Sequence, residues 1–174
     1  MSLQEQLELR IEREISNQMD TILEKVNRIA KKFSIDNKDE KSPFKNVLAV
    51  ATDSSSSLEV IKNYIRYQIG RKDSSLIWKS LVEEDMFAIA LVKELNKLNE
   101  DVTKILQKLR KNIPKNNPLE SYLTDTQNRE RIERNIHLKI AQLYLGYLAR
   151  EHTAMVGEKK EREKREKKRE KTKV

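Results

Sequence analysis

The side chains best suited to acid–base or metal chemistry are few and scattered in this sequence. There are two histidines, His137 and His152, and no cysteine. Neither histidine has a Cys or a second His at the spacing that a zinc site needs, so both are expected to be ordinary helical residues. Neither the phosphate-cradling motif G-x-x-x-x-G-K-[ST] nor the nucleophile motif G-x-S-x-G occurs. The sequence therefore predicts a protein that is not an enzyme and holds no metal and no cofactor.

One pair of side chains offers an alternative to this prediction. Arg131 and His137 lie on one expected helix with five residues between them. The pair resembles that of the HEPN ribonucleases, a helical family that uses an Arg and a His separated by four to six residues. In that family a polar residue usually follows the Arg, whereas Ile132 follows it here. A HEPN-like helical ribonuclease is therefore a minor alternative.

The most distinctive surface is expected on a helix that spans residues 58–69. The side chains of Leu58, Ile61, Ile65 and Ile69 trace its buried stripe. Cationic, aromatic and amide side chains stand beside this stripe: Lys62, Tyr64, Arg66, Tyr67, Gln68, Arg71 and Lys72. Cations bind phosphates and tyrosines stack on unpaired bases, so this set predicts a surface for single-stranded RNA. The structural alternative is that the tyrosines border the core, with their hydroxyl groups in water.

The charge of the chain also points to a polyanionic partner, and it is unevenly distributed. The formal net charge is +8 over 174 residues. Residues 158–174 hold ten Lys and Arg against five Glu, which leaves a net charge of about +3 for the remainder. Positive charge favours nucleic acid as a partner, although a charged segment of this kind is more often simply solvated.

Hydrophobic periodicity predicts the elements that carry these side chains. A first helix is expected to begin at Ser2, whose S-x-x-E spacing with Glu5 is that of a capping box. Its apolar side chains recur at steps of 3 and 4 from Leu7 to Phe33. Further helices are expected over residues 43–53, 58–69, 119–123 and 124–157, with one long helix that Ser74 or Ser75 caps and Pro114 ends. That long helix is either one rod of almost forty residues or two helices broken near Asn99.

These elements predict an all-α bundle of about five helices, one or two of them long. Residues 1–157 are expected to form one helical domain that stops at Gly157, without a β-sheet. Residues 158–174 are a charged low-complexity extension, either helical or disordered. No apolar signal sequence or membrane span is visible, which favours a cytoplasmic protein. The richness in Lys and Glu is compatible with a thermophilic source.

The segment from Asn63 to Arg71, with the sequence NYIRYQIGR, is followed by Trp78 and a long amphipathic helix. In this respect residues 44–98 resemble the small helical subunits of CRISPR effector complexes, type III in particular. The resemblance implies a non-enzymatic subunit that stacks in several copies along the crRNA and target duplex. It also implies that Arg66, Gln68, Arg71 and Lys62 contact the nucleic-acid backbone.

Two functional hypotheses of different classes follow from the sequence. The first is an RNA-associated structural subunit of a ribonucleoprotein complex that contacts RNA and other protein subunits. The second is a helical protein–protein scaffold or homo-oligomer whose charge serves solubility and stability.

Overall fold

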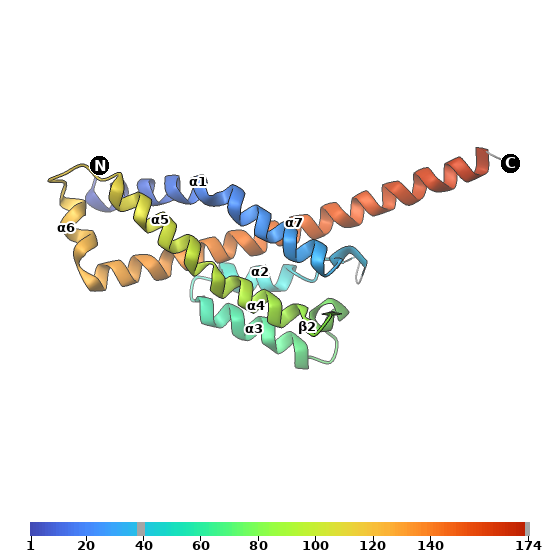
Figure 1. Ribbon diagram of the computed structural model, residues 1–174. Helices are drawn as coiled ribbons and strands as arrows, with labels where there is room; N and C mark the ends of the chain where they lie inside the picture. Colours follow the sequence, from blue (N-terminus) through green and yellow to red (C-terminus); the bar gives the residue numbers. More distant parts are fainter. Residues whose placement is uncertain (38–40, 173–174) are drawn as a thin grey trace.

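The computed structural model of the chain describes residues 1–37 and 41–172. Its elements are α1 (Leu3–Lys32), η1 (Ile35–Asn37), α2 (Lys45–Thr52), α3 (Leu58–Gly70), η2 (Leu76–Lys79), β1 (Leu81–Val82), β2 (Asp85–Met86), α4 (Phe87–Lys97), α5 (Asn99–Lys111), α6 (Pro118–Thr124) and α7 (Thr126–Thr172). The described residues are predominantly helical, which confirms the expected all-α bundle (Figure 1).

Helix α7 is the axis of the bundle. It packs against α1, α2, α3, α5 and α6. Beyond the body α7 continues as a free helix toward the C-terminal end of the chain (Figure 1). Its buried side chains run from Ile132 to Val156, so the body surrounds only this part of the helix.

Helix α1 confirms both features that the sequence predicts for it. The Ser2 hydroxyl accepts a hydrogen bond from the Glu5 backbone N–H at 3.2 Å, and the Glu5 carboxylate accepts one from the Ser2 N–H at 2.7 Å. The apolar stripe from Leu7 to Phe33 is buried or half-buried along its whole length. Its periodicity therefore gives the buried face of the helix correctly.

Polar side chains fix how α1 lies against α5. The buried Asp101 carboxylate of α5 accepts hydrogen bonds from Gln18 Nε2 at 2.8 Å and from Lys25 Nζ at 2.6 Å. Near the other end of the interface, Asn112 Nδ2 donates to the buried Glu14 carboxylate at 3.0 Å. Because the early part of α5 meets the later part of α1, the two helices are antiparallel.

An aromatic cluster joins the remaining elements. The ring of Phe44, just before α2, lies 5.7 Å from the Trp78 ring of η2 and 5.8 Å from the His152 ring of α7. The Phe87 ring of α4 lies 5.8 Å from Trp78 and 5.2 Å from Phe33 of α1. All five side chains are at least 98% buried, so this cluster is the centre of the core at this end of the bundle.

The structure corrects the expected start of the long helix. Ser75 caps only the short η2, through a hydrogen bond from the Ile77 N–H to its hydroxyl. A two-stranded antiparallel ladder follows, in which Leu81 pairs with Met86, so the expectation of no strand is wrong at this point. Glu83 makes the turn with a positive φ of 57°. The long rod is therefore α4 and α5, which meet at Leu98, close to the break expected near Asn99.

The structure also corrects the two helix ends that the sequence predicts at glycines. Gly70 was expected just after the end of its helix, but it is the last residue of α3, and its φ is not positive. Gly157 was expected to end the last helix, yet α7 passes through it to Thr172. Residues 158–172 are therefore a helical extension, one of the two forms that the sequence left open.

Candidate nucleic-acid interface

The side chains of the predicted RNA-binding set, on α3 and just after it, lie in different environments. Arg66 and Lys72 are exposed, and Arg71 is half-buried. The Lys62 ammonium is held by the Glu59 carboxylate at 2.5 Å and donates to Asn96 Oδ1 of α4 at 3.0 Å. Gln68 was expected beside the buried stripe, but it is 3% exposed and belongs to that stripe. Its side chain contacts the Tyr64 carbonyl and the Arg71 guanidinium, so it is not available on the surface.

The two tyrosines of α3 form a ring pair at the edge of the core. Their ring centroids lie 6.1 Å apart at an interplanar angle of 49°. Tyr67 is 57% exposed, whereas the Tyr64 ring packs partly against the core. Only Tyr67 therefore offers most of an aromatic face for stacking.

A basic cleft that the sequence did not predict lies between α1 and α4. It has a volume of about 350 Å³, and cationic side chains line both of its walls. On the α1 side these are Lys25, Arg28 and Lys32, and on the α4 side they are Lys93 and Lys97. Asp85 of β2 and Glu94 of α4 are the acidic residues in the lining, so cations outnumber anions there.

Ion pairs constrain some of these cations and leave others available. The Lys32 ammonium lies 2.5 Å from the Asp85 carboxylate, and Lys97 lies 3.4 Å from Glu94. Lys25 is paired with Asp101. Arg28 and Lys93 make no hydrogen bond or ion pair with the residues that the structure describes. These two side chains, one from each wall, are therefore the cations best able to bind an added anion.

The Lys32–Asp85 pair keeps both partners charged. The hydrogen bond and charge of Lys32 hold the pKa of Asp85 below its ordinary value. The same hydrogen bond raises the pKa of Lys32 above its ordinary value. A depressed carboxyl pKa means that Asp85 stays ionised at every pH above its ordinary range, so the pair persists through neutral pH.

A buried hydroxyl lies within reach of two charged residues of the cleft. Tyr144 of α7 is fully buried, and its hydroxyl has no hydrogen-bond partner among the described residues. Burial raises the pKa of Tyr144 far above its usual range, with a further increase from Glu94 and an opposing effect from Arg28. Both charged residues line the cleft, so its electrostatic field reaches the core.

Helix α4 connects this cleft with the basic side of α3. In Figure 1, α4 lies between α3 and the later part of α1. A second hollow, lined by Lys62, Asn63, Arg66 and Val92 among others, lies between α3 and α4. Lys93 and Lys97 line the cleft and Val92 lines the second hollow, and with 3.6 residues per turn Asn96 falls between them on α4. Three helices therefore contribute cations to one continuous face, which we call the α3–α4–α1 face.

The structure does not bring Arg131 and His137 to a common site. Arg131 Nη2 donates to the Tyr122 hydroxyl of α6 at 2.6 Å and contacts Asn128 Oδ1 at 3.1 Å. His137 Nε2 lies 2.7 Å from the Leu95 carbonyl oxygen of α4. The two side chains contact different elements, and the geometry of α7 gives no support to the HEPN-like arrangement.

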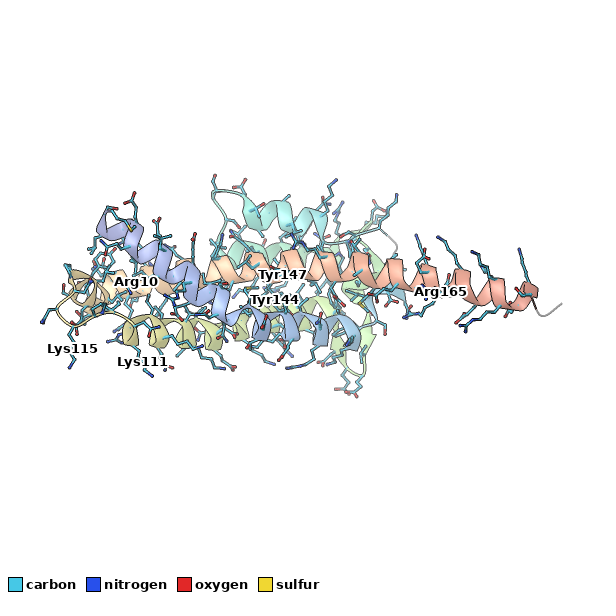
Figure 2. The ribbon with its side chains drawn as sticks, turned by 90° about the horizontal axis from the view of Figure 1, so that it is seen from above. Arg10, Lys111, Lys115, Tyr144, Tyr147 and Arg165 are labelled. Carbon is cyan, nitrogen blue, oxygen red and sulfur yellow. The ribbon has the colours of Figure 1, made fainter. Side chains whose placement is uncertain are left out.

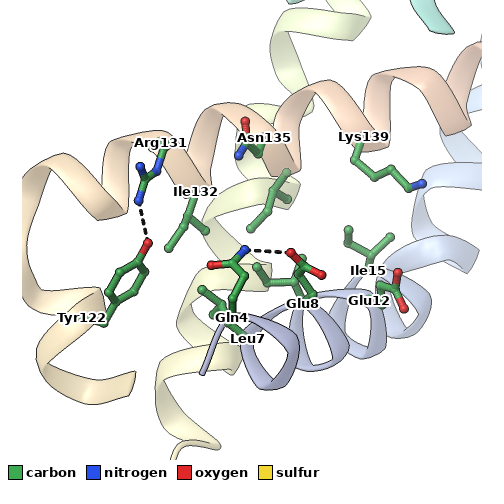
Figure 3. Close-up of a pocket in the computed structure, with 12 residues that line it drawn as sticks. Gln4, Leu7, Glu8, Glu12, Ile15, Tyr122, Arg131, Ile132, Asn135 and Lys139 are labelled. Carbon is green, nitrogen blue, oxygen red and sulfur yellow. Dashed lines mark hydrogen bonds between the residues drawn. The ribbon is translucent and has the colours of Figure 1, made fainter. Parts of the chain in front are cut away.

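Arg131 instead borders a groove between α1 and α7, with a volume of about 560 Å³ (Figure 3). Its floor is apolar and consists of Leu7, Ile11, Ile15, Ile132 and Ile136. Glu8 and Glu12 stand on the α1 rim, and Arg131 and Lys139 stand on the α7 rim. An apolar floor between rims of opposite charge is a surface that another protein segment can occupy.

Comparison of the chain with protein-family models, curated proteins and solved structures finds no match. Within residues 1–37 and 41–172, no three His, Asp or Glu side chains gather as a metal would need. No helix in the same ranges combines the length and apolar character of a membrane span.

Proposed function

We propose that this protein is a non-catalytic, RNA-associated structural subunit of a ribonucleoprotein complex. The observation that carries this proposal is the cleft between α1 and α4, where Arg28 and Lys93 face an open space from opposite walls. Two cations on opposite walls suit a polyanion that passes between them, because each can bind a different phosphate. The CRISPR small subunit, which the sequence resembles over residues 44–98, is the specific form of this proposal.

The α3 side of the face supplies the rest of the proposed contact. Arg66 is exposed beside Lys62, and Tyr67 offers a ring for stacking on an unpaired base. A chain of nucleotides that crosses α4 from the cleft would therefore meet phosphate-binding groups first and an aromatic group afterwards. Gln68 has no part in this contact, since it is buried.

Loss of the two available cations should weaken RNA binding markedly. For single strands the salt dependence of log K is about −0.7 per phosphate neutralised, so two lost contacts at about 0.1 M salt correspond to roughly a 25-fold lower affinity. We expect this decrease for Arg28→Ala/Lys93→Ala in the full chain, measured by fluorescence anisotropy with a labelled single-stranded RNA over a salt series. The slope against log[salt] should become shallower by about 1.4.

The matched control is Lys104→Ala/Lys108→Ala, which removes the same charge from exposed positions on α5, outside the cleft. This control should bind within about twofold of the unaltered protein if the cleft is the contact. Equal losses in both variants would mean that net charge alone governs binding, and the cleft would have no special role. No binding by the unaltered protein would remove the RNA proposal altogether.

A substitution that removes a negative charge from the cleft, and so should strengthen binding, tests the same site. Asp85→Asn removes the carboxylate that pairs with Lys32 and keeps the size of the side chain. The freed ammonium gains about one phosphate contact, so we expect roughly a fivefold higher affinity for single-stranded RNA at about 0.1 M salt. Because Asp85 stays ionised through neutral pH, the gain should be constant between about pH 6 and pH 8. An unchanged or lower affinity would contradict the proposal that RNA binds in this cleft.

The second candidate function is a protein–protein scaffold or homo-oligomer. The groove between α1 and α7 favours it, because its apolar floor is open between charged rims (Figure 3). The scaffold becomes the leading function if the full chain fails to bind RNA and sedimentation velocity shows a defined oligomer. A monomer that binds RNA through the cleft supports the first candidate.

A further inference from the structure

The last part of α7 is a second charged surface, separate from the α3–α4–α1 face. Residues 158–172 continue α7 without a break, and apart from the half-buried Lys159 they are exposed. Lys159 Nζ donates to Asn37 Oδ1 at 2.8 Å, close to where the helix leaves the body. At a rise of 1.5 Å per residue, these fifteen residues form a rod about 22 Å long. Figure 2 shows its side chains extending around the free helix, with Arg165 among them.

The charges on this rod are separated into stripes. Arg162, Arg165 and Arg169 follow one another at steps of 3 and 4, which places them on one side of the helix. Glu163, Glu166 and Glu170 follow the same steps on a neighbouring stripe. Most of the lysines lie on the side of the helix opposite the arginines: Lys160, Lys164, Lys167, Lys168 and Lys171. Of the two remaining glutamates, Glu158 lies on the arginine stripe, four residues before Arg162, and Glu161 lies between that stripe and the lysines.

Few of these cations are neutralised within the protein. Lys164 forms an ion pair with Glu161 at 3.0 Å. By contrast, no hydrogen bond or ion pair joins the following side chains to any residue in the described ranges: Arg162, Arg165, Lys167, Lys168, Arg169 and Lys171. If the segment served only as a self-stabilised solvated helix, its Glu and Lys/Arg side chains would be expected to pair along its length.

We propose that residues 158–172 bind the phosphate backbone of a nucleic-acid duplex as a preformed helix. The arginine stripe contacts the phosphates of one strand, while the lysines on the opposite side of the helix contact those of the other strand. The segment has no aromatic residue to stack on unpaired bases. A helix with cations on two sides fits between the phosphate rows of a groove, and the B-form major groove, about 12 Å wide, admits a helix. This site does not depend on the cleft proposed above.

The test is duplex binding by the full chain with Arg162→Gln/Arg165→Gln/Arg169→Gln. The probes are blunt duplexes of DNA and of RNA and a single-stranded RNA of the same sequence, followed by fluorescence anisotropy over a salt series. Removal of three phosphate contacts from a B-form DNA duplex should make the slope of log K against log[salt] shallower by about 2.7 and lower the affinity roughly 500-fold at about 0.1 M salt. Single-stranded RNA should be affected much less, and the two duplex probes show which helical form is preferred.

The control is Lys104→Gln/Lys108→Gln/Lys111→Gln, which removes three positive charges from exposed positions on α5. Circular dichroism should show that the arginine variant keeps its helix content, because glutamine is a good helix former. Equal losses of duplex affinity in the two triple variants would overturn the proposal, as would an unchanged affinity in the arginine variant. If Arg28→Ala/Lys93→Ala binds single-stranded RNA as well as the unaltered protein does, while duplex binding stays intact, the RNA-cleft proposal is rejected and this one still stands.

Discussion

Replacement of Lys25 by methionine should destabilise the protein by about 3 kcal/mol, because removing one partner of a buried ion pair leaves the other charge uncompensated. The side chain of Asp101 is fully buried, and Lys25 is its charged partner at 2.6 Å. In Lys25→Met only Gln18 Nε2 would still donate to the carboxylate. Methionine keeps most of the length of lysine and packs in a similar space, so lost volume contributes little. Urea unfolding followed by circular dichroism measures the change.

Replacement of the other partner, Asp101, should lower the free energy of unfolding by less. In Asp101→Leu the lysine is left without a partner, but its side chain is 16% exposed and its ammonium can turn into water. The double variant Lys25→Met/Asp101→Leu removes both charges and should recover most of the stability lost in Lys25→Met, since apolar replacements of buried pairs are often neutral. If Asp101→Leu proved more destabilising than Lys25→Met, the charge argument would be wrong and packing would dominate this interface.

Much of the helical architecture could be predicted from the sequence because its signals are local. The stripe from Leu7 to Phe33 fixes the buried face of α1, and Ser2 with Glu5 fixes its start. The turn after Pro114 and the short helix that follows it were also expected, and Asn117 caps that helix through the Leu119 N–H at 2.9 Å. Each of these features depends on residues only a few positions apart.

The start of α4 could not be placed from caps alone, although the sequence contained a clue. The apolar residues at the start of the expected long helix include a step of six residues from Leu81 to Phe87, and no single helical face has that step. The β1–β2 turn lies within this interval, with Glu83 at positive φ. Trp78, which a helical interpretation would have placed on a long rod, instead packs in the aromatic cluster.

The prediction that helices end at Gly70 and Gly157 was wrong for a different reason. A glycine ends a helix when the chain needs a left-handed residue to turn back, and neither Gly70 nor Gly157 has a positive φ. After Gly157 the sequence continues with strong helix formers and no proline, so nothing reverses the chain. A single glycine costs a helix only about 1 kcal/mol, which the neighbouring residues can offset.

The candidate site was the least predictable part of the molecule. Arg28 and Lys93 belong to distant segments, and each alone looks like an ordinary charge on a helix surface. Only the packing of α1 beside α4 brings them to one cleft. Lys62 and Arg66 could be proposed from the sequence alone, because they lie on a single helix beside an evident apolar stripe. The sequence misplaced Gln68, since an amide on the buried side of a helix is satisfied by contacts that periodicity does not reveal.

The aromatic cluster is the other place where one side chain should have a large effect. Phe44→Ala is expected to lower the free energy of unfolding by about 3–5 kcal/mol, the range for a large aromatic side chain removed from a core. Phe44 is fully buried, and its ring lies within 6.1 Å of the rings of Trp78, Phe87 and His152. These rings belong to η2, α4 and α7, so the cavity would weaken the attachment of three elements at once.

Phe44→Ala should also loosen one wall of the cleft. The Phe44 ring packs near Phe87, and Phe87 begins the helix that carries Lys93 and Lys97. Hydrogen exchange in Phe44→Ala should therefore increase over α2 and α4 more than over α5, which packs against α1 through separate contacts. Phe44→Leu fills most of the space and should cost less than about 1.5 kcal/mol, with exchange close to that of the unaltered protein. Uniform exchange changes in Phe44→Ala would mean that the bundle opens as one unit, in which case the cluster would stabilise the whole fold rather than the wall of the cleft.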